Sequence, residues 1–412
     1  MRQLASKAWQ FVNVSWQMIG MTVLLCVLAE CGYRAQASVR EQLGGGVQHS
    51  YTDGDPQSRL PWHAQFVKEY DEARVLRWKS YVYWTRLPSG SNRYVNVDSA
   101  GHRVTPQPTV PEVPVARVFT FGGSTMWGTS QRDSATIAAE LARRLQALAG
   151  AGQRIEVVNY GENGFVNTQD LIALELALRS GARPDVVVMY DGINDVGTVV
   201  QHGVAGLPQN EGKRIRDFAF GRAVDRSGFA RGWQKDSRAV AMLAGEFFNQ
   251  SDLLEWVQTL KKGPAPTYIA ADSAARSAVR VYVENARLVE ALARSYGFTP
   301  IFVWQPTPQS TPKPLTGFEQ RLLKSTMQDP YWRRIKETHA LVPALLNPAM
   351  ASAAPGHFVD ESTLFTGDTM SVFTDRIGHS TETSVPVIVD AFWPLVRRAI
   401  EARLATGKGA RR

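Results

Sequence analysis

A short apolar strand that runs into two glycines and a serine is the feature that most constrains this chain. Residues 117–121, Arg-Val-Phe-Thr-Phe, are mostly apolar and β-branched or aromatic, which predicts a buried strand. Gly122 and Gly123 permit a sharp turn, and Ser124 stands where that turn meets the N-terminus of a helix. A serine in this place has an exposed hydroxyl and backbone N–H groups beside it, as a nucleophile facing a developing oxyanion requires.

Three other interpretations of the junction are open at this point. In the first, Ser124 is only a helix cap. In the second, the junction is a phosphate-binding loop, because Gly123 and Gly128 have that spacing, but Thr129 stands where the motif requires lysine. In the third, it is a dinucleotide site, although the G-x-G-x-x-G pattern is absent. The choice between these interpretations and a serine nucleophile depends on the residues in the rest of the chain.

Strands and helices are predicted to alternate along the rest of the chain. The further strands lie at 154–159, 184–190, 300–305 and near Phe358, and the helices run from Asp133-Ser134 onward and at about 168–179, 273–295, 331–346 and 383–404. Polar or glycine-bearing segments follow two of the strands, and another such segment lies late in the chain. Open α/β sheets bind ligands at the carboxyl ends of their strands, so these segments are expected to share one site. The alternation predicts a three-layer α/β/α sandwich with a flavodoxin-like parallel sheet.

Taken in order, the segments resemble the four blocks of the SGNH hydrolases, also called GDSL-like esterases. That family has a serine after the first strand, a glycine after the second, a G-x-N-D after the third and a late D-x-x-H. Here Ser124 matches the first block, Asn-Tyr-Gly-Glu-Asn-Gly at 159–164 the second, and Gly-Ile-Asn-Asp at 192–195 the third. Asp375 and His379 match the fourth block. One block alone is a weak signal, whereas four in order are a strong one.

The resemblance implies a role for each of five residues. Ser124 would attack an acyl carbonyl, and His379 would accept its proton and later pass it to the leaving alcohol. Asp375 would hold the tautomer of the imidazole. The oxyanion would be met by the backbone N–H groups of Ser124 and Gly164 and by the side-chain amide of Asn194. This chemistry needs neither a metal nor a cofactor, and the sequence has no H-E-x-x-H or EF-hand pattern.

The fourth block departs from the family's pattern in one respect. Three residues, not two, separate Asp375 from His379. We expect the extra residue to be absorbed by Gly378, since glycine permits a tight turn. The resemblance covers roughly residues 116–400.

Other polar residues near the motifs are less favoured as catalytic residues. His357 is the rival base, because an apolar strand is predicted to follow it. His339 lies on a charged helix, where we expect it to be solvated. We expect Asp195 to shape the loop of the third block and Asn163 and Asp191 to form turns.

The N-terminus predicts that the rest of the chain is exported. Residues 11–29 carry no charge, are long enough to cross a bilayer, and follow Arg2 and Lys7. Two interpretations remain for segment 1–37: an uncleaved membrane anchor, or a signal peptide cut after Ala37. The catalytic domain would then be periplasmic or otherwise extracytoplasmic, either tethered or secreted.

The remaining chain divides into three predicted parts. Residues 38–113 form an extension and linker with an aromatic-rich stretch around 78–84, which we expect to pack against the main domain. Residues 114–405 form the hydrolase domain, with an insertion at about 197–270 that is expected to overhang the site. Residues 406–412 are a short basic tail. Both cysteines of the chain lie in its first 37 residues, so the exported part has no disulfide and no cysteine-based metal site.

The formal charge of +8 does not indicate nucleic-acid binding, because basic residues are dispersed among acidic ones. On an exported protein, positive charge favours anionic lipid or polysaccharide surfaces. The sequence therefore predicts a serine esterase for O-acetyl or other acyl esters, acting on a small molecule or on a cell-surface or exported polysaccharide. A lipid or thioester acylhydrolase, an acyltransferase of the same fold, and a non-catalytic polysaccharide-assembly protein remain as alternatives.

Overall fold

The computed structural model of the 412-residue chain describes residues 55–110, 112–215, 218 and 267–409, with a few positions between 15 and 28. The chain divides into two units, Met1–His49 with Lys213–Thr267, and Ser50–Gly212 with Tyr268–Arg412. Few residues of the first unit are described, among them helical positions 15–18. Most of the predicted insertion lies outside the described residues. The fold below is that of the second unit.

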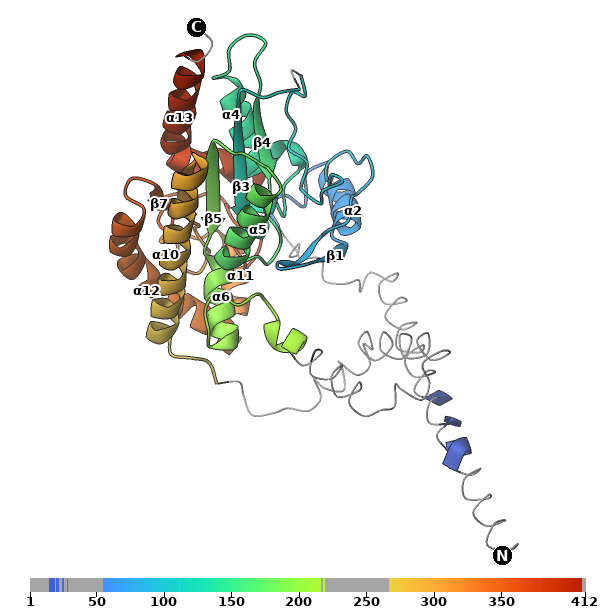
Figure 1. Cartoon of the computed structure of the whole chain (residues 1–412). Coiled ribbons are helices and arrows are strands. Elements are labelled where there is room, and N and C mark those ends of the chain that lie inside the picture. The colour runs from blue at the N-terminus through green and yellow to red at the C-terminus, as the bar shows by residue number, and fades with distance from the viewer. Residues whose placement is uncertain are drawn as a thin grey trace, which may run out of the picture. The chain divides into compact units, whose positions relative to one another are not determined.

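A five-stranded parallel sheet forms the centre of this unit (Figure 1). In spatial order its strands are β4 (Ile155–Asn159), β3 (Ala116–Gly122), β5 (Val186–Asp191), β6 (Thr299–Trp304) and β7 (Phe358–Asp360). Every neighbouring pair is parallel. The chain adds β4 on one side of β3 and then reverses to add β5 on the other, so the strand order is flavodoxin-like, as the sequence predicted. The carboxyl ends of β3 and β5 mark the point of reversal, where such sheets bind their ligands.

Helices cover both faces of the sheet and complete the three layers. One face carries α4 (Ile137–Gln146) and α13 (Val385–Gly409); the other carries α5 (Asn167–Arg179), α6 (Ile193–His202), α10 (Ala271–Tyr296) and α12 (Pro330–Ala353). A further helix, α11 (Gly317–Thr326), precedes α12. Successive side chains of β5 alternate between the two cores: Val187 and Met189 join the α10 side, and Val188 and Tyr190 the α13 side. This double burial explains why the strand reads as one continuous apolar run.

Most predicted elements agree with the structure, but the segment after Ser124 differs. Ser124 begins a separate single-turn helix, α3 (Ser124–Trp127), which ends at Gly128 with φ +93°. The predicted helix start at Asp133-Ser134 is only a 3-10 turn. The long helix α4 begins after it, where the Thr136 side chain accepts a hydrogen bond from the Ala139 N–H.

The helix predicted at 331–346 is also longer in the structure. α12 continues to Ala353, with Pro343 and Pro348 inside the helix. Leu346 and Met350 on this stretch are fully buried in the core of the α10 side. Packing of that apolar face therefore outweighs the hydrogen bonds lost at the prolines.

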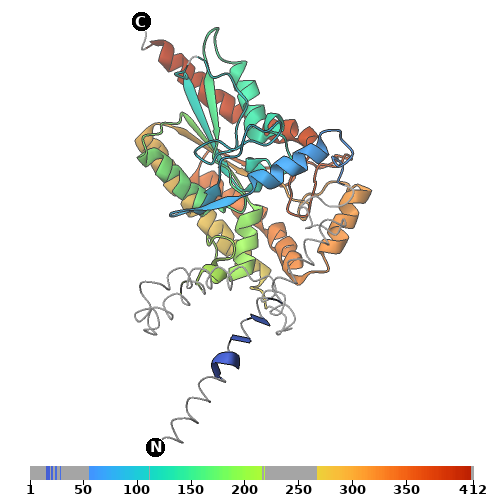
Figure 2. The ribbon, with the colours of Figure 1, turned by 90° about the vertical axis from the view of Figure 1, so that its right-hand side faces the viewer.

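The extension before β3 folds onto the main domain. It contains α2 (His63–Ala73) and a hairpin of β1 (Leu76–Lys79) and β2 (Tyr83–Arg86), and Figure 2 looks toward the side that carries α2. The strand predicted around 94–98 is reduced to a single bridge between Val97 and Arg103. Near the start of the extension, Gln57 donates to the Ser130 carbonyl and accepts from the Glu382 N–H, both at 2.8 Å.

The expectation that the aromatic stretch around 78–84 packs against the main domain is met only in part. Trp84 packs edge-on against Phe165 of the main domain, with ring centroids 5.5 Å apart. Trp78 and Tyr81 are instead 68% and 69% exposed. Of the four aromatic side chains in this stretch, Trp84 is directed into the domain and Trp78 and Tyr81 into solvent, while Tyr83 packs against Trp78 with ring centroids 5.4 Å apart.

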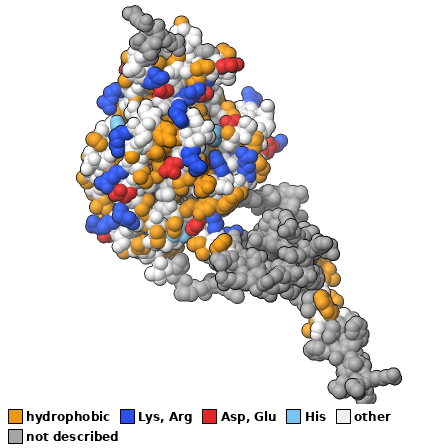
Figure 3. Space-filling model, in the orientation of Figure 1, with side chains coloured by type: hydrophobic (Ala, Val, Ile, Leu, Met, Phe, Trp, Pro, Cys, Tyr) orange, Lys and Arg blue, Asp and Glu red, His pale blue; other side chains and the backbone are white. Residues whose placement is uncertain are grey.

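Basic side chains are spread over the face of the folded part shown in Figure 3, with other side chains between them. This agrees with the dispersed charge of the sequence. No helix among the described residues has the length and apolar character of a membrane span, and most of the predicted span at 11–29 lies outside those residues.

The close contact of β3 with β5 predicts a large effect of a Cβ at Gly122. Its φ is +148°, and an added Cβ would lie 2.3 Å from the Tyr190 carbonyl oxygen. We expect Gly122→Ala to lower the free energy of unfolding by ~3 kcal/mol or more in urea unfolding. Gly181, with φ +96° and no atom within 4 Å of an added Cβ, is the matched control, and Gly181→Ala should cost ~1 kcal/mol. Equal losses in the two variants would show that the contact with Tyr190 is unimportant.

Candidate active site

Ser124 lies at the carboxyl end of the central strand β3, as the first residue of α3. The backbone N–H of a first helical residue has no partner within the helix, so this N–H can be offered to a ligand. Gly123 precedes it in extended backbone, and an added Cβ there would lie 2.4 Å from Nδ2 of Asn194. Glycine at 123 thus lets the Asn194 amide approach the serine's own backbone.

Ser124, His379 and Asp375 form one hydrogen-bonded row. The Oγ of Ser124 is 2.6 Å from Nε2 of His379, and Nδ1 of the same ring is 2.5 Å from Oδ2 of Asp375. Their exposed fractions are only 6%, 3% and 4%. Because both ring nitrogens have partners, the imidazole has a fixed orientation. A hydroxyl, an imidazole and a carboxylate in this order can move a proton from the serine to the histidine.

The turn between Asp375 and His379 accommodates the extra residue of the fourth block. The other carboxylate oxygen of Asp375 accepts backbone N–H groups from Ile377, Gly378 and His379, at 2.9, 3.1 and 3.3 Å. Gly378 takes φ +100°, a conformation that favours glycine. The Thr374 N–H then closes the turn on the His379 carbonyl at 2.8 Å. Asp375 therefore stabilises the turn through one carboxylate oxygen and orients the His379 ring through the other.

The three proposed oxyanion donors come from the ends of β3, β4 and β5. Asn194, at the start of α6, donates through Nδ2 to the carbonyl of Phe165 at 2.8 Å. Its Oδ1 accepts from Nε2 of Gln209 at 3.1 Å, so the amide orientation is set on both sides. Gly164 precedes Phe165 and has φ +77°, and an added Cβ there would lie 2.9 Å from Oε1 of Gln209. Gln209 belongs to none of the four motifs, and the sequence analysis did not single it out.

The two rival histidines lie elsewhere. His357 is paired with Glu290, Nδ1 to Oε1 at 2.6 Å, and has no hydrogen bond to Ser124. The expectation that His339 is solvated is wrong: it is 1% exposed, and burial lowers its pKa to about 3. The physical reason is helix periodicity, which places it on the same buried face of α12 as Ile335 and Val342.

A buried carboxylate cluster lies directly behind the site. It consists of Asp170, Asp191 and Asp195, whose exposed fractions are 0%, 2% and 7%. Asp170 accepts from the Gly122 N–H at 3.1 Å, while Asp191 and Asp195 accept from the side-chain and backbone amides of Asn167 at 2.8 and 3.0 Å. Asp195 thus shapes the loop, as expected, whereas the prediction of Asp191 as a turn residue is wrong, because it is the last residue of β5. Asn163 does lie in a turn.

Burial keeps protons in this cluster. It raises the pKa of Asp170 and Asp195 well above the ordinary range and that of Asp191 to about 6. After burial, the Asp191 carboxyl is the next cause that raises the pKa of Asp170, and the Asp170 carboxyl lowers the pKa of Asp191, the pattern of two carboxyls that share a proton. Within the described residues, no group of His, Cys, Asp and Glu has an arrangement suited to a metal ion.

The cluster predicts a loss of stability as the pH rises. The unfolded chain releases these protons near pH 4, whereas the folded chain retains them up to about pH 6 or above, so stability falls across that window. Asp170→Asn keeps the acceptor for Gly122 and supplies a permanent donor to Asp191. We expect the loss of unfolding free energy between pH 4.5 and 7.5 to shrink by ~1 kcal/mol or more in Asp170→Asn, measured by urea unfolding.

The exposed Asp390 supplies the control for this test, since Asp390→Asn removes a carboxylate without touching the cluster. An unchanged pH dependence in Asp170→Asn would contradict the shared proton.

No protein-family model and no curated protein matches the sequence. Solved structures similar to the chain include TesA, at 13% identity over 69% of this chain and 99% of that one, with a TM-score of 0.36. They also include the acetyl xylan esterase AlAXEase (13% identity, 68% and 99% covered, TM-score 0.35) and a lipolytic G-D-S-L family protein from Veillonella parvula DSM 2008 (12% identity, 69% and 99%, TM-score 0.35). The last of these carries the name of the family that the four sequence motifs resemble.

Proposed function

We propose that this chain is a serine esterase that hydrolyses small acyl esters, O-acetyl esters above all. The row from Ser124 through His379 to Asp375 carries the proposal. If Ser124 were only a helix cap, nothing would require an imidazole 2.6 Å from its oxygen, or a buried carboxylate that holds this imidazole. A serine nucleophile requires a base at this distance.

In the first half of the reaction, Ser124 Oγ attacks the ester carbonyl while Nε2 of His379 takes its proton. Asp375, bound to Nδ1, keeps Nε2 free of hydrogen and offsets the charge of the imidazolium that forms. The imidazolium then gives the proton to the leaving alcohol, and the acyl group remains on Ser124. In the second half, His379 activates a water molecule, which releases the acid and restores the serine.

The carbonyl oxygen becomes an anion in both halves, and three N–H donors would meet it. They are the backbone N–H groups of Ser124 and Gly164 and Nδ2 of Asn194. The contacts of Asn194 with Phe165 and Gln209 fix its amide before substrate binds. Such preorganised donors lower the barrier without any rearrangement during the reaction, each by ~3 kcal/mol.

The small exposed fraction of Ser124 favours a small acyl group. Only 6% of the Ser124 residue is exposed, which fits an acetyl group better than a long acyl chain. A saccharide alcohol is supported by the exposed Trp78 and Tyr81 of the hairpin, because aromatic rings stack on sugar rings. An exported location, tethered or secreted, rests on the N-terminal sequence alone.

Removing the nucleophile tests the proposal directly. We expect Ser124→Ala to lower kcat for p-nitrophenyl acetate and for acetylated xylan by ~10⁴-fold or more. Ser384→Ala is the matched control: Ser384 is also buried, and its hydroxyl donates to the Thr381 carbonyl at 2.8 Å and not to Ser124, His379 or Asp375. A folded wild-type protein that releases no acetate from either ester, with or without an added sugar acceptor, would contradict the esterase and favour a binding role.

Changing the carboxylate tests the row itself. Asp375→Asn keeps an oxygen for the three backbone N–H groups but places an N–H opposite Nδ1 of His379, which forces the proton onto Nε2. We expect kcat to fall by ~10³- to 10⁴-fold while the melting temperature stays within a few degrees of the wild type. Steady-state kinetics and thermal unfolding measure the two effects. Full activity in Asp375→Asn would remove the residue from the mechanism.

A further inference from the structure

The turn at 162–165, which carries Gly164, is held from the N-terminal extension. Nε of Arg86, the last residue of β2, donates to Oε1 of Glu162 at 2.9 Å. The same carboxylate oxygen accepts the Asn163 N–H at 2.8 Å, and the Glu162 N–H donates to the Gly122 carbonyl at 2.9 Å. Glu162 therefore joins three parts of the chain: the hairpin, the turn and the end of β3.

Arg86 also contacts the helix of the nucleophile. Its guanidinium lies over the ring of Trp127, 4.2 Å from the centroid, and Trp127 is the last residue of the helix that Ser124 begins. A second hydrogen bond, from Nη1 to the Ala73 carbonyl at 3.1 Å, fixes the guanidinium to the end of α2. One buried side chain thus spans the two segments that supply the backbone oxyanion donors.

Trp84 makes a second connection between the hairpin and the turn. Its Nε1 donates to the Asn163 carbonyl at 3.0 Å, and its ring packs edge-on against Phe165. The residues on either side of Gly164 are therefore both in contact with this side chain. Phe165 in turn supplies the carbonyl that receives the Asn194 amide.

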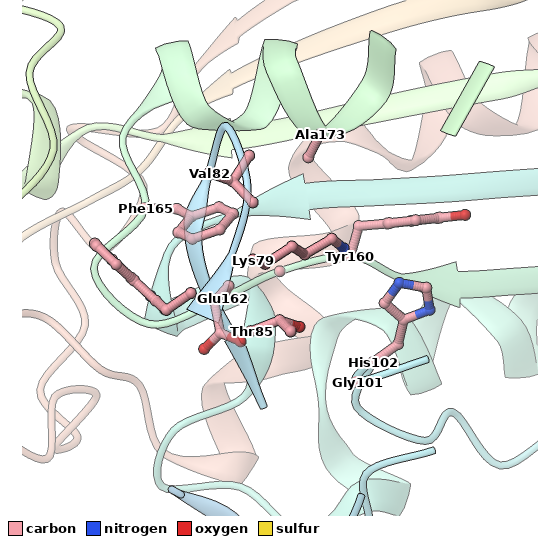
Figure 4. Close-up of a pocket in the computed structure, with 11 residues that line it drawn as sticks. Lys79, Val82, Thr85, Gly101, His102, Tyr160, Glu162, Phe165 and Ala173 are labelled. Atoms are coloured by element: carbon pink, nitrogen blue, oxygen red, sulfur yellow. The ribbon is translucent and has the colours of Figure 1, made fainter. Parts of the chain in front are cut away.

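The hairpin and the turn are separated elsewhere by a pocket, shown in Figure 4. Lys79 and Val82 line it from the hairpin, and Tyr160, Glu162 and Phe165 line it from the segment between β4 and α5. Trp84 and Glu162, the partner of Arg86, both line this pocket, so the contacts between the hairpin and the turn lie beside it.

The buried Glu162 carboxylate depends on the positive charge of Arg86 beside it. Burial raises the pKa of Glu162, and the charges of Arg86 and, more weakly, Lys79 oppose that rise. Without the guanidinium, the carboxylate is more easily protonated or displaced, because a buried charge with a weaker partner is costly. Either change alters the hydrogen bond to the Asn163 N–H, next to Gly164.

We propose that Arg86 and Trp84 are positioning residues of the oxyanion site, which hold the Gly164 N–H in line with those of Ser124 and Asn194. The proposal rests on the esterase function above. Neither residue touches the reacting atoms, and both act through Glu162, Asn163 and Phe165. An interaction needed only when the oxyanion forms affects kcat and leaves KM nearly unchanged.

The test compares kcat and KM of variants in the full-length protein, with kcat expressed per serine titrated by a fluorophosphonate. We expect Arg86→Gln to lower kcat by ~30- to 100-fold and Trp84→Phe, which keeps the aromatic packing, by ~5- to 10-fold, with KM changed by no more than ~3-fold. Arg86→Lys, which keeps the charge but not the Nε contact, should lie between Arg86→Gln and the wild type.

Two matched controls separate an effect on the position of the turn from an effect on the stability of the fold. Arg154 is buried and pairs with the half-buried Glu156 at 3.1 Å at the opposite end of β4, so Arg154→Gln removes an arginine–carboxylate pair far from the turn. Trp78→Phe alters an exposed tryptophan on the same hairpin. Both controls should keep kcat within ~2-fold of the wild type, whatever their melting temperatures.

The outcomes distinguish this inference from the proposed function. Activity that requires Ser124, together with equal kcat in Arg86→Gln, Trp84→Phe and their controls, would overturn the positioning role and leave the esterase intact. A rise in KM at constant kcat would overturn it as well, since it would place the two residues in substrate binding. Activity that persists in Ser124→Ala would refute the esterase itself.

Discussion

The approach of the Asn194 amide to Gly123 and to the Phe165 carbonyl is the contact on which the rest of the site depends. Asn194 follows β5, Gly123 follows β3 and Phe165 follows β4, so this one side chain connects the ends of three neighbouring strands. The contact is possible only because position 123 has no Cβ. Once these strand ends are fixed, the serine, the Gly164 turn and the amide have defined relative positions, and His379 completes the arrangement from the far end of the sequence.

Much of this arrangement could be predicted from the sequence, because its signals are local. The apolar runs at β3, β5 and β6 predicted the strands, and the residues after β3, β4 and β5 predicted where Ser124, Gly164 and Asn194 lie. The expected turn at Gly378 is present as well. Periodic apolar patterns and glycine-bearing turns are determined by nearby residues, so a single sequence contains them.

The wrong predictions, and the site residues that belong to no motif, are explained by tertiary packing. His339 is on a helix with many charged residues, but its own face is buried against the sheet. Pro348 follows the predicted helix end at 346, and packing of the same helix carries it past this proline to Ala353. Gln209 and Arg86 belong to no motif, and their partners lie 15 and 76 residues away in the sequence. Contacts of this kind follow from the fold and leave no pattern in a single sequence.

The bond between Gln57 and Glu382 spans 325 residues, and the one between Ser124 and His379 spans 255. Contacts this distant in sequence are made late in folding, because the intervening chain must first be ordered. During synthesis, β3, β4 and β5 emerge long before the segment that carries His379. A chain that is still being synthesised therefore contains the serine before it contains the base that would activate it.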